Sequence, residues 1–245
     1  MVPDRSFLAL QRRFAERWAA LAGIPDESAY LECTTWYRQV CGLGRDFDAH
    51  DATWRALLAA LGAAVDPDAV LHAWAVDHER PMDHGPVIDF VWSPDDRTVR
   101  LNFLGERSGD GSPLAARHVG ERRREVAGVV RRATADHPDA EWLRGRSWLY
   151  NLEAYRRLFP EVFLAGLAPS KTDLQFLATW GQFLDSRWRL KADLAAALEE
   201  RIRRAVTTDD LERAFPLPVL ETRARLATVR QALDAMAWGA GSSRA

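Results

Sequence analysis

Lysine, cysteine and long apolar runs are scarce in this chain of 245 residues. Two cysteines, Cys33 and Cys41, are too few for a small protein stabilised by several disulfides. No run reaches the ~18 apolar residues of a membrane-spanning helix, and the first residues lack the basic and apolar regions of a secretory signal. Apart from Lys171 and Lys191, all 33 basic residues are arginine, a bias typical of GC-rich bacterial genomes. We therefore expect a cytoplasmic bacterial protein.

The charge balance argues against partners held by a strong positive field. The chain has 33 basic and 35 acidic residues, a net charge of -2. We therefore expect no membrane partner and no nucleic-acid partner, because either would need a local basic patch. Cys33 and Cys41 lie eight positions apart in one predicted helix, about 12 Å along its axis, which is too far for a disulfide. Both are expected to be free, buried thiols.

The hydrophobic pattern predicts an α+β fold, a mostly helical single domain packed on a small antiparallel sheet. After a helical first third, two apolar segments flank the turn at residues 93–97 and predict an antiparallel hairpin. A long helix is expected from Ser112 and Pro113 to about Ala135, and a short helix or strand at residues 148–159. Helices are predicted near residues 7–22, 30–41, 54–61, 190–206, 209–215 and 219–238, and Asp66 and Pro67 are expected to open another. We expect one domain over residues 1–238 and a disordered tail at residues 239–245.

Residues 100–160 hold twelve arginines and eight acidic residues, a local excess of +4. In the long predicted helix, His118 and Arg122 lie beside the buried stripe, where a cation needs a partner. That partner is either an internal acidic residue or the carboxylate, phosphate or sulfate group of a substrate. Guanidinium suits the substrate because it presents two donors in one plane.

A second candidate cluster is the segment at residues 144–160, in which arginines, aromatic rings and an amide lie close together. Helical spacing also allows its aromatic residues to be core rather than site. The predicted substrate-binding residues come from both clusters and from the end of the predicted hairpin, where Asn102 and Arg107 lie. They are Asn102, Arg107, His118, Arg122, Arg144, Arg146, Trp148, Tyr150 and Asn151.

Two resemblances accompany these clusters. Residues 144–160 and 180–185, Arg-Gly-Arg-Ser-Trp-Leu-Tyr-Asn-Leu-Glu-Ala-Tyr-Arg-Arg-Leu-Phe-Pro and Trp-Gly-Gln-Phe-Leu-Asp, resemble segments of an uncharacterised bacterial family. This resemblance implies no activity. Residues 117–121 are similar to the Arg-His-Gly-Glu motif of histidine phosphatases, but they contain one extra residue and fall inside a predicted helix.

Acid–base groups gather in the loop at residues 77–86, which leads into the strand that carries Asp89. His84 and Asp89 are the predicted catalytic residues, with a surface turn as the alternative for the loop. His72, His78 and His84 are spaced by six, so they cannot share one helix face as metal ligands. The sequence has no zinc motif, phosphate-binding loop or dinucleotide fingerprint, and we expect neither a metal nor a cofactor.

Two classes of function fit these features. The first is a small-molecule enzyme of bacterial, including specialised, biosynthesis that binds an anionic substrate through arginines. A base would then assist elimination or intramolecular cyclisation with loss of sulfate or phosphate, for example aziridine formation, as a cofactor-independent lyase or cyclase. The alternatives are a non-catalytic ligand-binding or partner subunit and a phosphoester hydrolase. A protein partner or a homodimer stays open.

Overall fold

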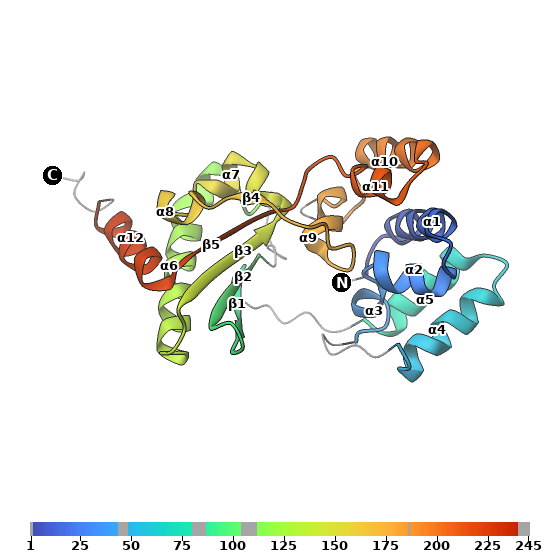
Figure 1. Ribbon diagram of the computed structural model, residues 1–245, viewed down its shortest axis with the longest axis horizontal. Helices are drawn as coiled ribbons and strands as arrows, with labels where there is room; N and C mark the ends of the chain where they lie inside the picture. Colours follow the sequence, from blue (N-terminus) through green and yellow to red (C-terminus); the bar gives the residue numbers. More distant parts are fainter. Residues whose placement is uncertain (1, 44–48, 80–86, 104–111, 186, 240–245) are drawn as a thin grey trace. The chain divides into compact units, whose positions relative to one another are not determined.

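The computed structural model describes residues 2–43, 49–79, 87–103, 112–185 and 187–239 (Figure 1). Contacts within the chain form two compact units, each built from two stretches of sequence. The first unit comprises Met1–Asp83 and Thr172–Leu217, and the second comprises His84–Lys171 and Pro218–Ala245. The predicted α+β class is confirmed. The single domain over residues 1–238 stays a prediction, and the expected tail lies, except for Gly239, outside the described residues.

The first unit is helical in its described residues. Its core includes Phe14, Trp180 and Phe215, with the rings of Phe14 and Trp180 packed edge to face at 5.3 Å. The Trp180 indole N–H donates to the carbonyl oxygen of Cys33 at 3.0 Å, which joins the two sequence stretches of this unit. Its helices are α1 (Arg5–Ala22), α2 (Asp26–Cys33), α3 (Trp36–Gln39), α4 (Ala52–Gly62), α5 (Pro67–Asp77), α9 (Leu177–Trp180), the 3-10 turn η3 (Gly181–Phe183), α10 (Ala192–Arg204) and α11 (Thr208–Glu212).

The expectation of one helix over residues 30–41 is wrong. Helix α2 ends at Cys33, and α3 begins at Trp36. Thr34 is extended between them, and its hydroxyl donates to the carbonyl oxygen of Tyr30 at 2.5 Å. Threonine competes with helix continuation through such local bonds. Both cysteines are free and buried, as predicted, and burial raises the pKa of the Cys41 thiol to about 12.

The second unit contains the sheet. Its strands are β1 (Ile88–Ser93), β2 (Thr98–Phe103), β3 (Trp142–Ser147), β4 (Ala168–Pro169) and β5 (Leu220–Arg225), in the order β1-β2-β3-β5-β4. The predicted hairpin is confirmed as β1 and β2. The sheet is mixed rather than wholly antiparallel, because β2 and β3 pair in parallel across the connection that contains the long helix. The described helices of this unit are η1 (Ala116–His118), α6 (Val119–Asp136), η2 (Trp148–Asn151), α7 (Glu153–Arg156), α8 (Glu161–Leu164) and α12 (Leu226–Gly239).

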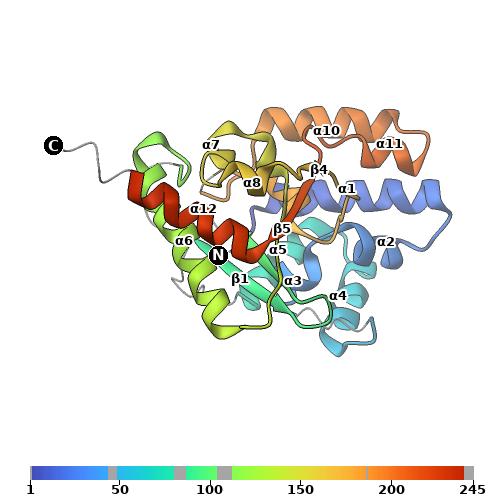
Figure 2. The ribbon, with the colours of Figure 1, turned by 60° about the vertical axis from the view of Figure 1, so that its left-hand side comes forward.

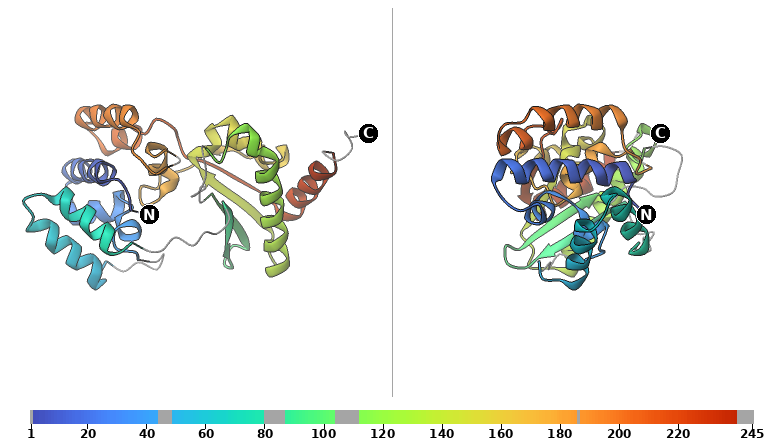
Figure 3. Two further views of the ribbon diagram at one scale, coloured as in Figure 1. Left: turned by 180° about the vertical axis from the view of Figure 1, so that it is seen from behind. Right: turned by 90° about the vertical axis from the view of Figure 1, so that its right-hand side faces the viewer.

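Helices α6 and α12 contact each other and cover one side of the sheet (Figures 2 and 3). Of the predicted apolar stripe, Val126, Val130 and Ala133 of α6 are buried, whereas Ala115 and Val119 are only half-buried. Helix α6 begins later than the expected start at Ser112 and Pro113, because the 3-10 turn η1 precedes it. The Ser112 hydroxyl oxygen accepts a hydrogen bond from the backbone N–H of Leu114 at 3.2 Å. None of the described helices is both long and apolar enough to cross a membrane.

Candidate functional site

The sheet of the second unit has one apolar face and one polar face. Residues paired across neighbouring strands project to the same side, and successive residues alternate. Val99, Leu143 and Ala224 are paired in this way on the side that the helices cover. The opposite side, called the polar face below, carries Asp89, Val91, Ser93, Thr98, Arg100, Asn102, Trp142, Arg144, Arg146, Glu221, Arg223 and Arg225.

Three arginines lie side by side at the centre of the polar face. Arg100 of β2 pairs with Arg144 of β3, which pairs with Arg223 of β5. We call these three residues the arginine row. Neighbouring strands are about 4.8 Å apart, and like charges directly opposite one another destabilise a sheet. The row is therefore an electrostatic cost that something must offset.

Glu221 offsets part of this charge. The Arg144 guanidinium donates to both carboxylate oxygens of Glu221, from Nε at 2.9 Å and from Nη2 at 2.7 Å. The Ser170 hydroxyl also donates to Glu221, at 3.1 Å. Burial acts to raise the pKa of Glu221, but the hydrogen bonds and positive charge of Arg144 outweigh it and hold that pKa below its ordinary value. Among the described residues, this is the one ion pair in the arginine row.

Arg223 stacks on an aromatic ring and forms no ion pair within the described residues, although its charge contributes to lowering the pKa of Asp96. Its guanidinium carbon lies 4.4 Å from the centre of the Trp142 ring, and that of Arg225 lies 4.1 Å from it. Arg223 Nη2 makes long contacts with the Thr98 hydroxyl at 3.3 Å and the Asp96 carbonyl at 3.4 Å. The Trp142 indole therefore makes cation–π contacts with two guanidinium groups.

Arg100 has the least satisfied guanidinium of the row. Its Nε is buried and has no hydrogen-bond partner within the described part of the chain. A buried guanidinium donor without an acceptor is costly. Five other arginines, Arg122 among them, share this state of the Nε, so what distinguishes Arg100 is that it stands in the row without an ion pair among the described residues.

The predicted residues of β3 and η2 divide between the two faces. Arg144 and Arg146 lie on the polar face, where Arg146 donates to the carbonyl oxygen of Lys171. Asn151 donates to the carbonyl oxygens of Trp148 at 2.7 Å and Pro218 at 2.8 Å, so its amide is used in holding η2. Trp148 is half-buried beside it.

Tyr150 lies on the covered side of the sheet. It is 1% exposed and packs against Tyr155 and Phe159, with ring centres 5.0 and 5.7 Å away. Burial raises its pKa well above the usual value. This position favours the core interpretation of Tyr150, because a ligand on the polar face cannot reach the ring.

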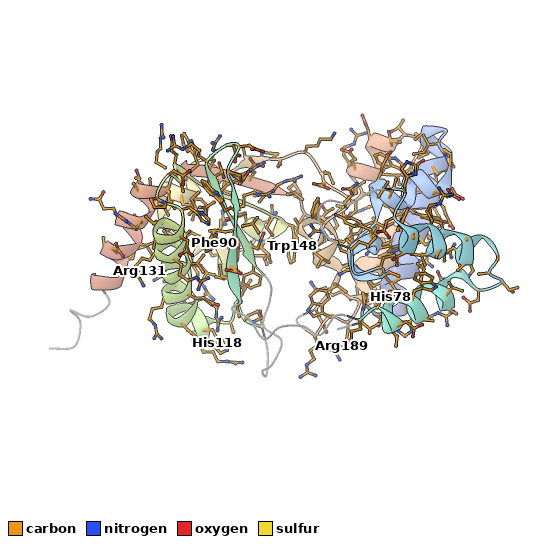
Figure 4. All side chains as sticks on the ribbon, turned by 90° about the horizontal axis from the view of Figure 1, so that it is seen from below. His78, Phe90, His118, Arg131, Trp148 and Arg189 are labelled. Atoms are coloured by element: carbon orange, nitrogen blue, oxygen red, sulfur yellow. The ribbon has the colours of Figure 1, made fainter. Side chains whose placement is uncertain are left out.

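Arg122 forms internal ion pairs. Its side chain is 5% exposed and contacts Glu125 at 2.6 Å and Glu121 at 2.8 Å. Glu125 also accepts a hydrogen bond from the backbone N–H of Ile88 at 3.2 Å, which ties α6 to β1. The structure thus favours the ion-pair alternative for Arg122. His118, at the start of this helical segment (Figure 4), contacts Glu121 at 3.5 Å.

The predicted base borders the arginine row but pairs with an arginine outside it, since Asp89 lies two residues from Val91, the partner of Arg100. Asp89 is on the edge strand β1, with β2 between it and Arg144. Its carboxylate pairs with Arg132 of α6 at 2.9 Å. Asn102 is its neighbour on β2. The other predicted catalytic residue, His84, and the predicted ligand Arg107 lie outside the described residues.

Sequence reasoning missed the residues that complete the polar face: Arg100, Trp142, Glu221, Arg223 and Arg225. A signal was present in the period-two pattern of both unrecognised strands. In β3, arginines alternate with Leu143 and Gly145, and in β5 charged residues alternate with Thr222 and Ala224. Such alternation is typical of a strand with one covered face.

Comparison with known proteins finds no significant match, whether to a family model, a curated protein or a solved structure. These comparisons therefore add neither a family nor a function to the geometry. Among the described residues, no group of three or more histidine, cysteine, aspartate or glutamate side chains is arranged to hold a metal ion.

Proposed function

We propose that the second unit binds an anionic small molecule on the polar face of its sheet, through Arg100, Arg144 and Arg223. The observation that carries this proposal is the arginine row, which has three guanidinium groups on adjacent strands and one carboxylate partner in the described chain. A phosphate, sulfate or carboxylate group would offset the remaining charge. It would also supply an acceptor for the buried Arg100 Nε.

The polar face supports binding better than acid–base chemistry. Its described carboxylates, Asp89 and Glu221, are both engaged by arginine. The lowered pKa of Glu221 makes it a weak base at neutral pH. The elimination or cyclisation reaction therefore stays a separate hypothesis, and anion binding is the part of it that we propose here. It agrees with the alternative of a ligand-binding subunit.

The test is a thermal-shift series with phosphate, sulfate and chloride at matched ionic strength. An anion that binds the folded protein raises its melting temperature by mass action. We expect phosphate and sulfate to stabilise the wild type more than they stabilise Arg100→Gln. The matched control is Arg124→Gln, which removes an exposed arginine of α6.

The control separates a specific site from general salt effects, since sulfate stabilises many proteins by exclusion from their surface. Arg124→Gln should keep the full shift. Equal shifts in the wild type and Arg100→Gln would contradict the proposal, as would an equal loss of the shift in both variants.

A further inference from the structure

We infer that the ligand carries two anionic groups joined in series, such as the two phosphoryl groups of a diphosphate. This inference rests on the proposed anion-binding function and specifies its ligand. It follows from the directions in which the arginines of the polar face are held.

Arg144 and Arg223 lean in opposite directions along the strands. They are directly opposite each other in register. Arg144 bonds Glu221, which lies two residues before Arg223 on β5 and opposite Arg146. Arg223 instead stacks on Trp142, two residues before Arg144 on β3. Because β3 and β5 are antiparallel, these contacts draw the two guanidinium groups apart.

The polar face therefore has two cationic positions. One lies at Arg100 and Arg144, and the other at Trp142, where Arg223 and Arg225 stack. From their shared level, Arg144 is drawn toward Glu221 and Arg223 toward Trp142, each partner lying about 7 Å along the strands in opposite directions. A charge-assisted hydrogen bond to an anion is only about 2.8 Å long. One tetrahedral anion cannot bond fully at both positions. Two groups linked through an oxygen can reach both.

Acidic residues border the basic surface. Glu221 lies beyond the row on β5, Asp89 occupies the edge strand, and Glu141 contacts Arg225 at 2.6 Å. These carboxylates would repel a polyanion that extended past the row. The charge distribution thus favours a compact diphosphate-type ligand over the backbone of a nucleic acid.

The test is calorimetric titration of the full chain with orthophosphate, pyrophosphate and a short oligothymidylate at constant ionic strength. We expect the pyrophosphate Kd to be about tenfold lower than the orthophosphate Kd, because two positions are used instead of one. Arg223→Gln should weaken pyrophosphate binding more than orthophosphate binding, so that the ratio of the two Kd values falls from about tenfold to near one. Arg225→Gln provides a second variant of the same position should the first fail to fold.

The control and the alternative outcomes separate the two proposals. Arg131→Gln, on α6 and paired with Asp234, removes an equal charge away from the polar face and should keep the preference for pyrophosphate. Equal affinity for orthophosphate and pyrophosphate would contradict a ligand with two anionic groups but would leave anion binding intact. A preference for pyrophosphate that survives in both Arg223→Gln and Arg225→Gln would have the same meaning. Tighter binding of the oligothymidylate would indicate a nucleic acid instead. Failure of every anion to bind would reject both proposals.

Discussion

At the scale of single residues, Glu221 links the stability of the sheet to its charge. The carboxylate neutralises Arg144 and accepts the Ser170 hydroxyl. Its pKa is lowered in the folded protein, so its stabilising contribution is complete above its ordinary value of 4.5. That contribution is lost as the pH falls through the lowered folded-state value.

Glu221→Gln removes this charge while keeping the shape of the side chain. We expect the free energy of unfolding to fall by about 1 kcal/mol at pH 7, the scale of a partly exposed charged hydrogen bond. The difference from the wild type should shrink as the pH is lowered below about 4.5, because protonated Glu221 no longer carries the charge. Urea unfolding at a series of pH values measures both effects.

The same variant probes anion binding. Loss of the negative charge beside the arginine row should tighten phosphate binding by about threefold. Glu153→Gln, at an exposed glutamate that pairs with Arg156 in α7, is the matched control and should leave the affinity unchanged. Weaker phosphate binding by Glu221→Gln would contradict the placement of the anion beside Arg144.

At the scale of elements, β3 depends on a glycine. An added Cβ at Gly145 would lie 2.8 Å from Tyr150 Cζ and 3.2 Å from Cε2, with the hydroxyl oxygen closer still. Tyr150 is buried in an aromatic cluster and cannot swing out to solvent. The side-chain-free position therefore lets the ring pack directly against the strand.

Gly145→Ala should destabilise the protein by about 1–3 kcal/mol, the usual cost of overpacking a core. The matched control is Gly128→Ala in α6, where an added Cβ meets no atom within 4 Å. That change should stabilise by up to about 1 kcal/mol, because alanine is the better helix former. Chemical denaturation of both variants, followed by circular dichroism, measures the two signs; a neutral Gly145→Ala would show that Tyr150 is not confined.

The strands also show how far the sequence alone could lead. The β1 and β2 hairpin was predictable because a turn separates two apolar, β-branched segments. Strand β3 was missed although its residues alternate, because the alternation covers only six residues and Gly145 lowers strand propensity. Strand β5 was included in the helix predicted over residues 219–238, because apolar residues recur at helical spacing through most of that range. Helix α12 in fact begins at Leu226.

The candidate site was predictable only in part for the same reason. Arg144 and Arg146 were identified from local composition, whereas Arg100 and Arg223 join them through pairing between strands that are distant in sequence. The residue types and their spacing along the chain do not reveal how β2, β3 and β5 pair. They also could not decide between an internal acidic residue and a substrate anion as the partner of Arg122, which pairs with Glu125 in the structure.

At the scale of the whole molecule, the buried apolar residues form two clusters that coincide with the two units. Leu57 is fully buried in the first cluster and Val130 in the second. Each unit has its own core and its own backbone hydrogen bonds. We therefore expect the two units to differ in local stability.

Leu57→Ala tests this expectation. The cavity should cost about 2–5 kcal/mol, and we expect amide hydrogen exchange to accelerate in α1, α4 and α5 while α6 keeps its protection. Val130→Ala is the reciprocal variant and should accelerate exchange in α6 and the sheet. If either substitution accelerates exchange equally in both units, the chain unfolds as one cooperative domain, as the sequence predicts for residues 1–238.

The position of β5 in the chain has a consequence during synthesis. This strand follows Thr172–Leu217, so the ribosome completes the first unit before it makes the partner of β3. Until then, one edge of β3 has no strand beside it, and unpaired edges promote association between chains. Arg144 and Arg146 lie on this strand and project from its polar face, and charged residues on an unpaired strand oppose association between chains. Of the arginines that we assign to ligand binding, we therefore expect Arg144 also to protect the unfinished sheet from association.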